Sequence, residues 1–580
     1  MRYLRMLSNS VIGGVTFALY VTILALQINP RYSLAGVPSL AATLILSYGV
    51  HASTGFYALI VFRQLVAAEI ISPGWISFRF LVWMSSGAAL VGSLLMWVNL
   101  RGFGPVLDVD AQRRMTAGAI GLSICAAVMV VLAIGHRWTR RHSSRPGAAA
   151  LGLTLMASLA VPLMLRGPGT GPARPLRWSR PPAVVATPAG DRKVTLILFE
   201  GASLDLLAPM AAEGRLPHFG HLLEAGASMH VATIRPTQPG PVWTAVATGK
   251  LPFKNGIRYA ASYFPIAGEE PLEVLPDYCF SHGLVRFGLL RQVIHTSRDL
   301  TARPLWALLA AQGIPVGVVN WPVTQPAVEV RNFLVSDQFE TLQQTTVDME
   351  NAGAIWPREA LPGVVAAAAL AGRDQPQMAG AAGDLVREFV GQTCRADRAH
   401  EQVASYLDGR DPSRFLAVRY ECLDKVGEYF LRYAVPGAFG DVSDEEVQRY
   451  GAVVASNYAT ADAAIGRAVE AQRPGDLLIV ASGFGMEPLG MGKRLLELSL
   501  GNVDQSGTHE RAPDGFLLAF GTDIAPGRHP RASLVDLAPT ILYFFGLPVA
   551  RDMDGFARTD LFTRAFTAAR PITYIPTYER

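Results

Sequence analysis

The stretch KVTLILFEGASLDLL, residues 193–207, decides the fold of this chain. Its run VTLILF is apolar without a break, which is typical of a strand buried on both faces of a parallel sheet. Two similar runs follow, LLIVAS at residues 477–482 and FLLAF at residues 516–520, and an amphipathic segment at residues 443–472 precedes LLIVAS. Strands that alternate with helices predict an α/β fold with a doubly wound sheet, which we place over residues 191–580.

Five apolar segments precede this part of the chain, at residues 9–28, 36–62, 76–99, 115–135 and 147–165. Each is long enough, or nearly so, to cross a bilayer as a helix. The first segment lacks an Ala-x-Ala-like cleavage site and is followed by four more, so a cleavable signal peptide is not expected. The sequence predicts a transmembrane bundle of about five helices over residues 1–165. Residues 166–190 hold six prolines and four glycines, which is typical of an extended linker.

Arginines in the short loops indicate the orientation of this bundle, because loops rich in positive charge stay in the cytoplasm. Arg2 and Arg5 precede the first span, and the loop at residues 136–145 between the fourth and fifth spans carries four arginines. Five spans place both groups on one side. We therefore expect a multi-pass protein of the cell membrane with a cytoplasmic N-terminus and a C-terminal domain outside the cytoplasm, for example in the periplasm. Three arginines that soon follow the fifth span argue against this orientation, namely Arg174, Arg177 and Arg180.

The composition fits a membrane protein and excludes some partners. Half of the 580 residues are hydrophobic, 17% are charged, and the net charge is +4. So small a charge at this length gives no support to nucleic-acid binding. Cys125 lies in an apolar segment, whereas Cys279, Cys394 and Cys422 allow at most one internal disulfide. No C-x-x-C pair occurs, so a cysteine zinc site is not expected.

Six segments in a fixed order carry a resemblance to a known family. Besides residues 193–207, they are RPTQPGPVWTAVATGKLPFKNGI (235–257), RYECLDKVGE (419–428), LLIVASGFGMEP (477–488), SGTHERAPDGFLLAFG (506–521) and SLVDLAPTILYFFGLPVARDMDG (533–555). Together they resemble the alkaline phosphatase superfamily, and most closely its type I phosphodiesterase/nucleotide pyrophosphatase branch. The resemblance implies phosphoryl transfer by an activated hydroxyl at one or two metal ions. It also implies a cap insertion over the active site, at about residues 260–412.

Several positions that the resemblance makes catalytic carry other residues in this chain. The metal-binding aspartate expected after the first strand is Glu200, whose carboxylate is still an oxygen ligand for a metal ion. The nucleophile position is Pro239, which has no hydroxyl. Thr237 is the nearest substitute if the loop shifts its register, and Thr244 is another. The family's Asp-His pair of metal ligands is also replaced, by Ala481 and Ser482.

One half of the expected metal site keeps residues that can bind a metal ion. Asp424 and Glu428 are four residues apart, which places both carboxylates on one face of a helix, and the resemblance puts His509 beside them. Two carboxylates and one imidazole can hold a single divalent ion such as Zn²⁺ or Mn²⁺. The alternative is a solvated or salt-bridged helix face with His509 anchoring a loop, and in that case no metal is bound.

Two functions are compatible with these degenerate motifs. The first is a membrane-anchored, phosphodiesterase-like enzyme that hydrolyses phosphate esters outside the cytoplasm with weak or altered activity. Its substrate would be an unknown phosphorylated small molecule or a lipid headgroup. The alternative is a catalytically inactive pseudoenzyme that binds a ligand or a partner protein of the cell envelope. The lost nucleophile and ligands favour the pseudoenzyme, whereas the retained glycines of the motif loops favour an altered chemistry.

Overall fold

The computed structural model describes residues 1–66, 73–139, 145–171, 190–266, 268–276, 281–345, 348–371, 384–500, 504–509 and 511–579. The chain forms two compact units. The helical unit consists of Met1–Arg174 together with Arg258–Ile294, and the α/β unit consists of Pro175–Ile257 together with His295–Arg580. The expected cap, residues 260–412, is therefore divided between the units. Most of the expected linker, residues 172–189, lies outside the described residues.

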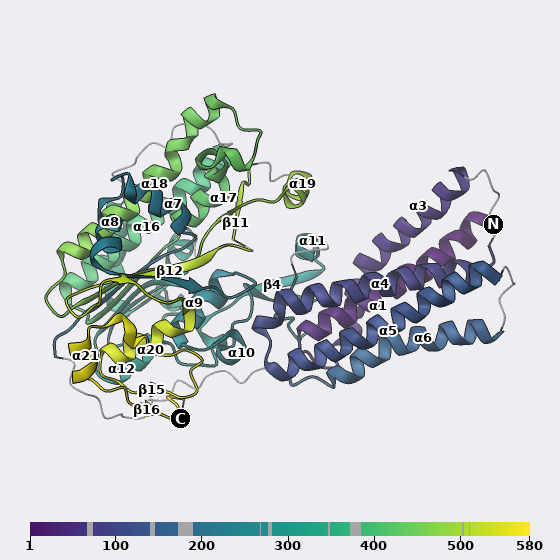
Figure 1. Ribbon diagram of the computed structural model, residues 1–580, viewed down its shortest axis with the longest axis horizontal. Helices are drawn as coiled ribbons and strands as arrows, with labels where there is room; N and C mark the ends of the chain where they lie inside the picture. The colour runs from purple at the N-terminus through teal and green to yellow at the C-terminus, as the bar shows by residue number, and fades with distance from the viewer. Residues whose placement is uncertain are drawn as a thin grey trace. The chain divides into compact units, whose positions relative to one another are not determined.

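The helices of the first unit lie side by side (Figure 1). They are α1 (Arg2–Ile28), α2 (Val37–Leu44), α3 (Val50–Val66), α4 (Phe78–Phe103), α5 (Val109–Thr139) and α6 (Arg145–Arg166). A π-helical turn, Ile45–Gly49, joins α2 to α3, so that these two helices form one continuous stretch of 30 residues. Within the described part of the chain, five helices are thus long and apolar enough to cross a membrane. This confirms the predicted bundle.

A segment from the middle of the chain, Arg258–Ile294, also belongs to the helical unit. It contains a pair of antiparallel strands, β3 (Ala261–Pro265) and β4 (Leu290–Ile294). The side chain of Asn29, just after α1, accepts hydrogen bonds from the backbone N–H groups of Glu273 and Val274 at 2.7 and 2.8 Å. Arg31 forms an ion pair with Glu273 at 2.9 Å. We call this segment the docked hairpin, because backbone hydrogen bonds and charge both tie it to the end of α1.

The α/β unit is built on a ten-stranded sheet with the order β13-β2-β12-β9-β1-β8-β5-β6-β7, and β14 pairs with β2. Neighbouring strands from β9 to β6 run parallel, whereas β12 is antiparallel to both β9 and β2. The strands are β1 (Val194–Phe199), β2 (Ala227–Ala232), β5 (Val316–Trp321), β6 (Asn332–Ser336), β7 (Ile355–Trp356), β8 (Phe415–Tyr420), β9 (Leu477–Phe484), β12 (Asp514–Phe520), β13 (Gly527–Arg528) and β14 (Ala532–Ser533). The apolar runs quoted above thus form β1, β9 and β12.

Helices cover both faces of this sheet (Figure 1). One face carries α7 (Leu204–Ala212), α8 (Pro217–Ala225), α16 (Asp384–Arg410), α17 (Cys422–Ala434) and α18 (Asp444–Glu470), and the other carries α9 (Pro239–Thr248), α12 (Leu305–Ala311) and α20 (Leu537–Phe544). The first layer packs on the sheet through a core that includes Phe199, Phe219, Val426 and Ile465. Two covered faces confirm the predicted α/β architecture.

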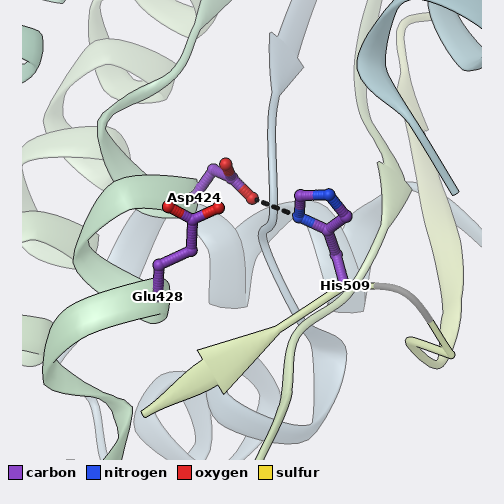
Figure 2. Close-up of side chains that lie close together, drawn as sticks. All are labelled: Asp424, Glu428 and His509. Atoms are coloured by element: carbon purple, nitrogen blue, oxygen red, sulfur yellow. Dashed lines mark hydrogen bonds and ion pairs between the residues drawn. The ribbon is translucent and has the colours of Figure 1, made fainter. Parts of the chain in front are cut away.

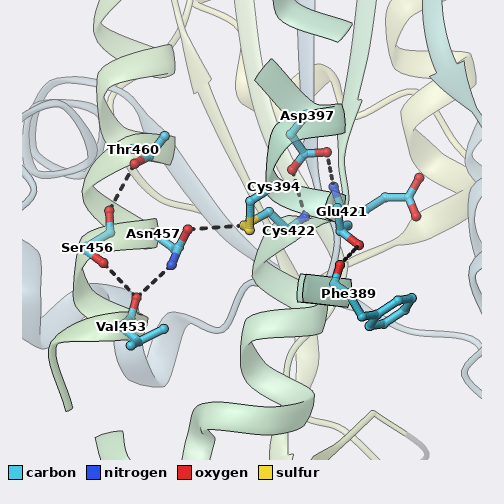
Figure 3. Close-up of a disulfide and its surroundings, with 10 residues drawn as sticks. Phe389, Cys394, Asp397, Glu421, Cys422, Val453, Ser456, Asn457 and Thr460 are labelled. Atoms are coloured by element: carbon cyan, nitrogen blue, oxygen red, sulfur yellow. Dashed lines mark hydrogen bonds between the residues drawn. A yellow bond between two sulfur atoms is a disulfide. The ribbon is translucent and has the colours of Figure 1, made fainter. Parts of the chain in front are cut away.

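A disulfide joins α16 to α17, between Cys394 and Cys422 (Figure 3). Beside it, the carboxylate of Asp397 accepts hydrogen bonds from the backbone N–H groups of Glu421 and Cys422 at 2.8 and 2.7 Å. These bonds satisfy N–H groups at the start of α17 that have no partner within the helix. The disulfide and Asp397 together fix the beginning of α17.

The carboxyl group of Asp397 is expected to make stability depend on pH. Burial outweighs the two hydrogen bonds and raises the pKa of Asp397 to about 8. Because the folded protein then holds the proton more tightly than the unfolded chain, this contribution to stability is present at about pH 4 and is lost as the pH rises to about 8. Through Asp397, the free energy of unfolding falls by up to about 1.4 kcal/mol per pH unit within this range, and we expect Asp397→Asn to remove this dependence. Chemical unfolding of the purified protein across this pH range measures it, and an unchanged slope would contradict the assignment.

Candidate active site

The ends of two neighbouring strands bring the motif residues together. Glu200 follows β1, and β8 leads into α17, which carries Asp424. Gly201 lets these two elements approach each other closely. Its φ is +70°, and a Cβ atom at this position would lie 2.6 Å from the Cα atom of Asp424. Only glycine fits at such a distance and φ, which explains the Glu-Gly pair at the end of the strand.

Asp424, Glu428 and His509 lie together, with the histidine on the loop that follows β11 (Gly507–Thr508), as Figure 2 shows. Each offers one ligand atom, and the three atoms lie within 4.8 Å of one another. Asp424 is 1% exposed, and its Oδ1 is 3.2 Å from Nδ1 of His509. In the part of the chain that the structure describes, no other group of His, Cys, Asp or Glu side chains has this arrangement. We call these three residues the acidic-histidine cluster, and a divalent metal ion fits its ligand atoms.

The charges in this cluster shift the pKa values of its members. Burial raises the pKa of Asp424, but the charges of Lys425 and His509 outweigh it and hold that pKa well below its ordinary value. Burial lowers the pKa of His509, but the charge of Asp424 outweighs it, so that the pKa of the imidazole is raised. Asp424 is therefore ionised at neutral pH, while His509 favours a proton that a metal ion has to displace.

Lys425 lies against both carboxylates of the cluster. Its Nζ is 3.1 Å from Oδ2 of Asp424 and 2.9 Å from Oε2 of Glu428. The lysine side chain is 24% exposed, which leaves it a route to solvent. The ammonium group thus competes for the same oxygen atoms that a metal ion uses.

We expect Lys425→Met to raise the affinity of the cluster for Zn²⁺ or Mn²⁺ by about 10–100-fold. The physical reason is that a positive charge against the ligand atoms opposes a second cation by roughly 1–3 kcal/mol. Titration calorimetry of the purified full-length protein measures this affinity. Lys193→Met is the matched control, because Lys193 is 27% exposed and pairs with Asp408 at 2.6 Å at the other end of β1. Equal affinities in the wild type and in Lys425→Met would show that the ammonium does not compete.

Glu200 lies outside this cluster and is bonded to another cation of the chain. Nε of Arg419 donates a hydrogen bond to Oε2 of Glu200 at 2.6 Å, and Nη2 contacts the same oxygen. The indole N–H of Trp243 lies 3.4 Å from that oxygen. On its other side, Arg419 donates from Nη1 to Glu421 at 2.7 Å. Burial raises the pKa of Glu200 to about 7; the charge of Arg419 opposes this shift, and the charges of Asp424 and Glu421 add to it.

Arg419 is the first residue of the quoted segment RYECLDKVGE, but the sequence assigns it no function. Its one signal in the sequence is a charged residue near the end of an otherwise apolar strand, FLAVRY at residues 415–420. A charged side chain is almost never fully buried without a partner, and Arg419 is 5% exposed. The partner could not be named from the sequence, since it follows from the parallel register in which Leu198 lies opposite Arg419.

The residues at the expected nucleophile position and ligand pair, and the two threonines near them, lie in α9, in β9 and in the segment before α9. Pro239 is the first residue of α9. Thr237 is fully buried, and its hydroxyl oxygen has no hydrogen-bond partner among the described residues. Thr244 lies within α9 and is also buried. Ala481 and Ser482 lie in β9, where the Ser482 hydroxyl donates to the carbonyl oxygen of Phe484 at 2.7 Å.

A comparison with known families supports the resemblance that the motifs carry. The profile of the family described as type I phosphodiesterase/nucleotide pyrophosphatase matches residues 194–511, which is more than half of the chain. The chain belongs to this family. The resemblance carried by the six motifs is thereby confirmed, and the family is typically metal-dependent. No curated protein matches the chain.

Solved structures of ectonucleotide pyrophosphatase/phosphodiesterase 5 are similar to part of the chain. The human protein is 13% identical and has a TM-score of 0.38, and the match covers 64% of this chain and 100% of the human one. The murine protein is also 13% identical, with a TM-score of 0.37 and the same coverage. At this identity and TM-score, the similarity carries no argument about the site.

Proposed function

We propose that this protein is a membrane-anchored binding protein for phosphate esters that holds a single divalent metal ion and hydrolyses phosphodiesters slowly or not at all. The observation that carries the proposal is the acidic-histidine cluster, which gathers three ligands for one ion. A second ion lacks the ligands that the family supplies, because Ala481 and Ser482 stand in their place. The missing ligands therefore favour a binding role over a hydrolytic one.

The charge of the site explains why ligand binding should depend on the metal. The cationic groups of the site are already paired with carboxyl groups: Arg419 with Glu200 and Glu421, Lys425 with Asp424 and Glu428, and His509 with Asp424. A phosphate ester is itself an anion and finds no unpaired positive charge among these groups. When bound, a divalent ion supplies the positive charge that attracts and polarises a phosphoryl oxygen. Asp424, Glu428 and His509 would hold that ion.

Hydrolysis needs a nucleophile, and the expected position cannot supply one. Pro239 has no hydroxyl group. The hydroxyl of Thr237 lies on a side chain with no exposed surface, so substrate and water do not reach it in this conformation. The loss of a single transition-state contact costs roughly 10²–10³ in rate, and here both the nucleophile and a pair of ligands are replaced. We therefore expect the protein to bind phosphate esters but not to hydrolyse them at an appreciable rate.

We place the α/β unit outside the cytoplasm. Disulfides such as Cys394–Cys422 persist in oxidising compartments and are rare in the cytosol. At the end of α6, Arg166 donates hydrogen bonds to the carbonyl oxygens of Leu26 and Asn29 at 2.7 and 2.9 Å. The ends of α1 and α6 therefore lie on the same side, opposite the N-terminus. Since the arginine-rich loops favour a cytoplasmic N-terminus, the chain that follows α6 is expected on the outer side.

Metal content of the detergent-solubilised full-length protein tests the binding role. After dialysis against trace Zn²⁺ and Mn²⁺, mass spectrometry is expected to find about one equivalent in the wild type and none in His509→Ala. His529→Ala is the matched control, because the two histidines are 14% and 12% exposed and each contacts one aspartate. Two equivalents in the wild type, or none, would overturn the proposed single-ion site.

Two further measurements test the catalytic and topological parts of the proposal. Bis(p-nitrophenyl) phosphate is expected to be hydrolysed by the metal-loaded protein at close to the rate in buffer, and rapid turnover abolished by Asp424→Ala would overturn this.

Protease added outside intact spheroplasts is expected to cleave the α/β unit. Complete protection there, with cleavage after lysis, would place that unit in the cytoplasm instead.

A further inference from the structure

We propose that Arg419 is a built-in cation that occupies Glu200 in place of a metal ion, so that the chain itself fills one half of the family's metal site. The inference deepens the proposed function, because it names what replaces the second ion. It rests on the proposed function only in the assumption that one ion at most is bound.

The guanidinium of Arg419 is committed to protein oxygens on both sides. Nε donates to Oε2 of Glu200 at 2.6 Å, and Nη2 contacts the same oxygen. Nη1 donates to Oε1 of Glu421 at 2.7 Å and to the carbonyl oxygen of Asn320 at 3.3 Å. Arg419 and Glu200 are 5% and 3% exposed. At most one N–H group of Nη2 remains, so Arg419 is placed to hold the protein together rather than to bind a phosphate.

These contacts connect the ends of three adjacent strands. Glu200 follows β1, Arg419 belongs to β8, and Asn320 belongs to β5, in the order that the sheet has them. The Asn320 side chain closes the network, since its Nδ2 donates to Oε1 of Glu421 at 3.0 Å and to the carbonyl oxygen of Arg419 at 3.2 Å. Asn320 has a φ of +60°, a conformation in which asparagine is enriched. The arginine thus joins strand ends that a metal ion would otherwise connect.

A second metal ion does not fit at Glu200. An ion bound to this carboxylate would lie against a guanidinium that already contacts it, and two cations at such a distance repel each other strongly in a buried site. Ala481 and Ser482 add no charged ligand. A buried arginine keeps its charge and cannot be removed by a chelator. The replacement therefore makes this half of the site independent of metal supply.

Metal content of Glu200→Gln, measured in the full-length protein, tests this inference directly. If Arg419 stands in place of an ion, Glu200→Gln is expected to bind as much Zn²⁺ or Mn²⁺ as the wild type. A fall in bound metal would overturn the inference. A wild type that binds no metal at all would instead overturn the proposed function, and this inference would be judged by the stability cycle alone.

A stability cycle gives a second, independent readout. In a His509→Ala background, which removes one ligand of the acidic-histidine cluster, Arg419→Met is expected to lower the thermal midpoint, because it leaves buried carboxylates without a counter-charge. Adding Glu200→Gln to Arg419→Met should restore part of that loss. Purely additive losses would overturn the inference, as would a rise of the midpoint on adding Zn²⁺ while Arg419 is intact. Arg419→Lys keeps the charge but loses the planar fork, so it is expected to lower the midpoint less than Arg419→Met. If Arg419→Met does not fold, the metal content of Glu200→Gln remains the deciding test.

Discussion

Gly201→Ala is expected to lower the free energy of unfolding of the α/β unit by about 3–4 kcal/mol, of which the positive φ contributes roughly 1 and the clash the remainder. The new Cβ would lie 2.6 Å from the Cα of Asp424 and 2.8 Å from its Oδ1. Backbone cannot move aside as a flexible side chain does, so α17 has to shift away from β1. We therefore also expect the variant to lose metal binding at the acidic-histidine cluster.

Gly214→Ala separates the two causes of this effect. Gly214 has a φ of +74°, close to the +70° of Gly201, but no atom lies within 4 Å of a Cβ placed there. It therefore carries the conformational cost without the clash, and we expect a loss of about 1 kcal/mol and unchanged metal binding. Urea unfolding followed by tryptophan fluorescence measures both variants. Equal losses at the two glycines would contradict the close approach of β1 and α17.

Removal of the disulfide by Cys394→Ala together with Cys422→Ala is expected to cost about 3 kcal/mol. The bond closes a loop with a sequence separation of 28, and loops of this size restrict the unfolded chain by an entropy worth about 3–4 kcal/mol. The measurement is urea unfolding of wild type and variant without reducing agent. Cys125→Ala is the control, because Cys125 is a free cysteine. Reduction of the wild type should reproduce most of the loss, and a variant as stable as the wild type would show that the bond is not formed.

The same double variant should also weaken the metal site. Cys422 is the first residue of α17, and Asp424 lies two residues later. The backbone N–H bonds from Glu421 and Cys422 to Asp397 would remain to hold the helix start. We therefore expect a metal affinity reduced about 10-fold rather than abolished, as is typical when a supporting group of a ligand is lost.

Much of the fold could be predicted because apolar patterning is a local property of the sequence. The runs at residues 194–199, 477–482 and 516–520 became β1, β9 and β12, and the five apolar segments became five long helices. Proximity of Asp424 and Glu428 follows from helical spacing. The position of His509 beside them came from the family resemblance, since 81 residues separate it from Glu428 and no local pattern connects them.

The features that could not be predicted depend on which distant segments of the chain come together in the fold. Arg419 and Glu200 are 219 residues apart, and only the register of β1 on β8 brings them together. Burial of the arginine could be suspected from its strand, but its function could not. The pairing of Cys394 with Cys422 likewise follows from the packing of α16 beside α17 and not from the spacing of the cysteines. The docked hairpin carries no motif, and its contacts with Asn29 and Arg31 were not foreseen.

The docked hairpin has a practical consequence for dissecting the protein. A fragment that starts at residue 191 would keep Glu273 and Val274 but lose Asn29 and Arg31, which hold them. The backbone groups of Glu273 and Val274 would then lose the partners that Asn29 provides, and Glu273 would keep only its ion pair with Arg258. Conversely, a protease cut at about residue 190 would leave the carboxy-terminal piece attached to the helices without any peptide bond between them. In this protein the polypeptide enters the helical unit twice, and its anchor is therefore not a removable tail.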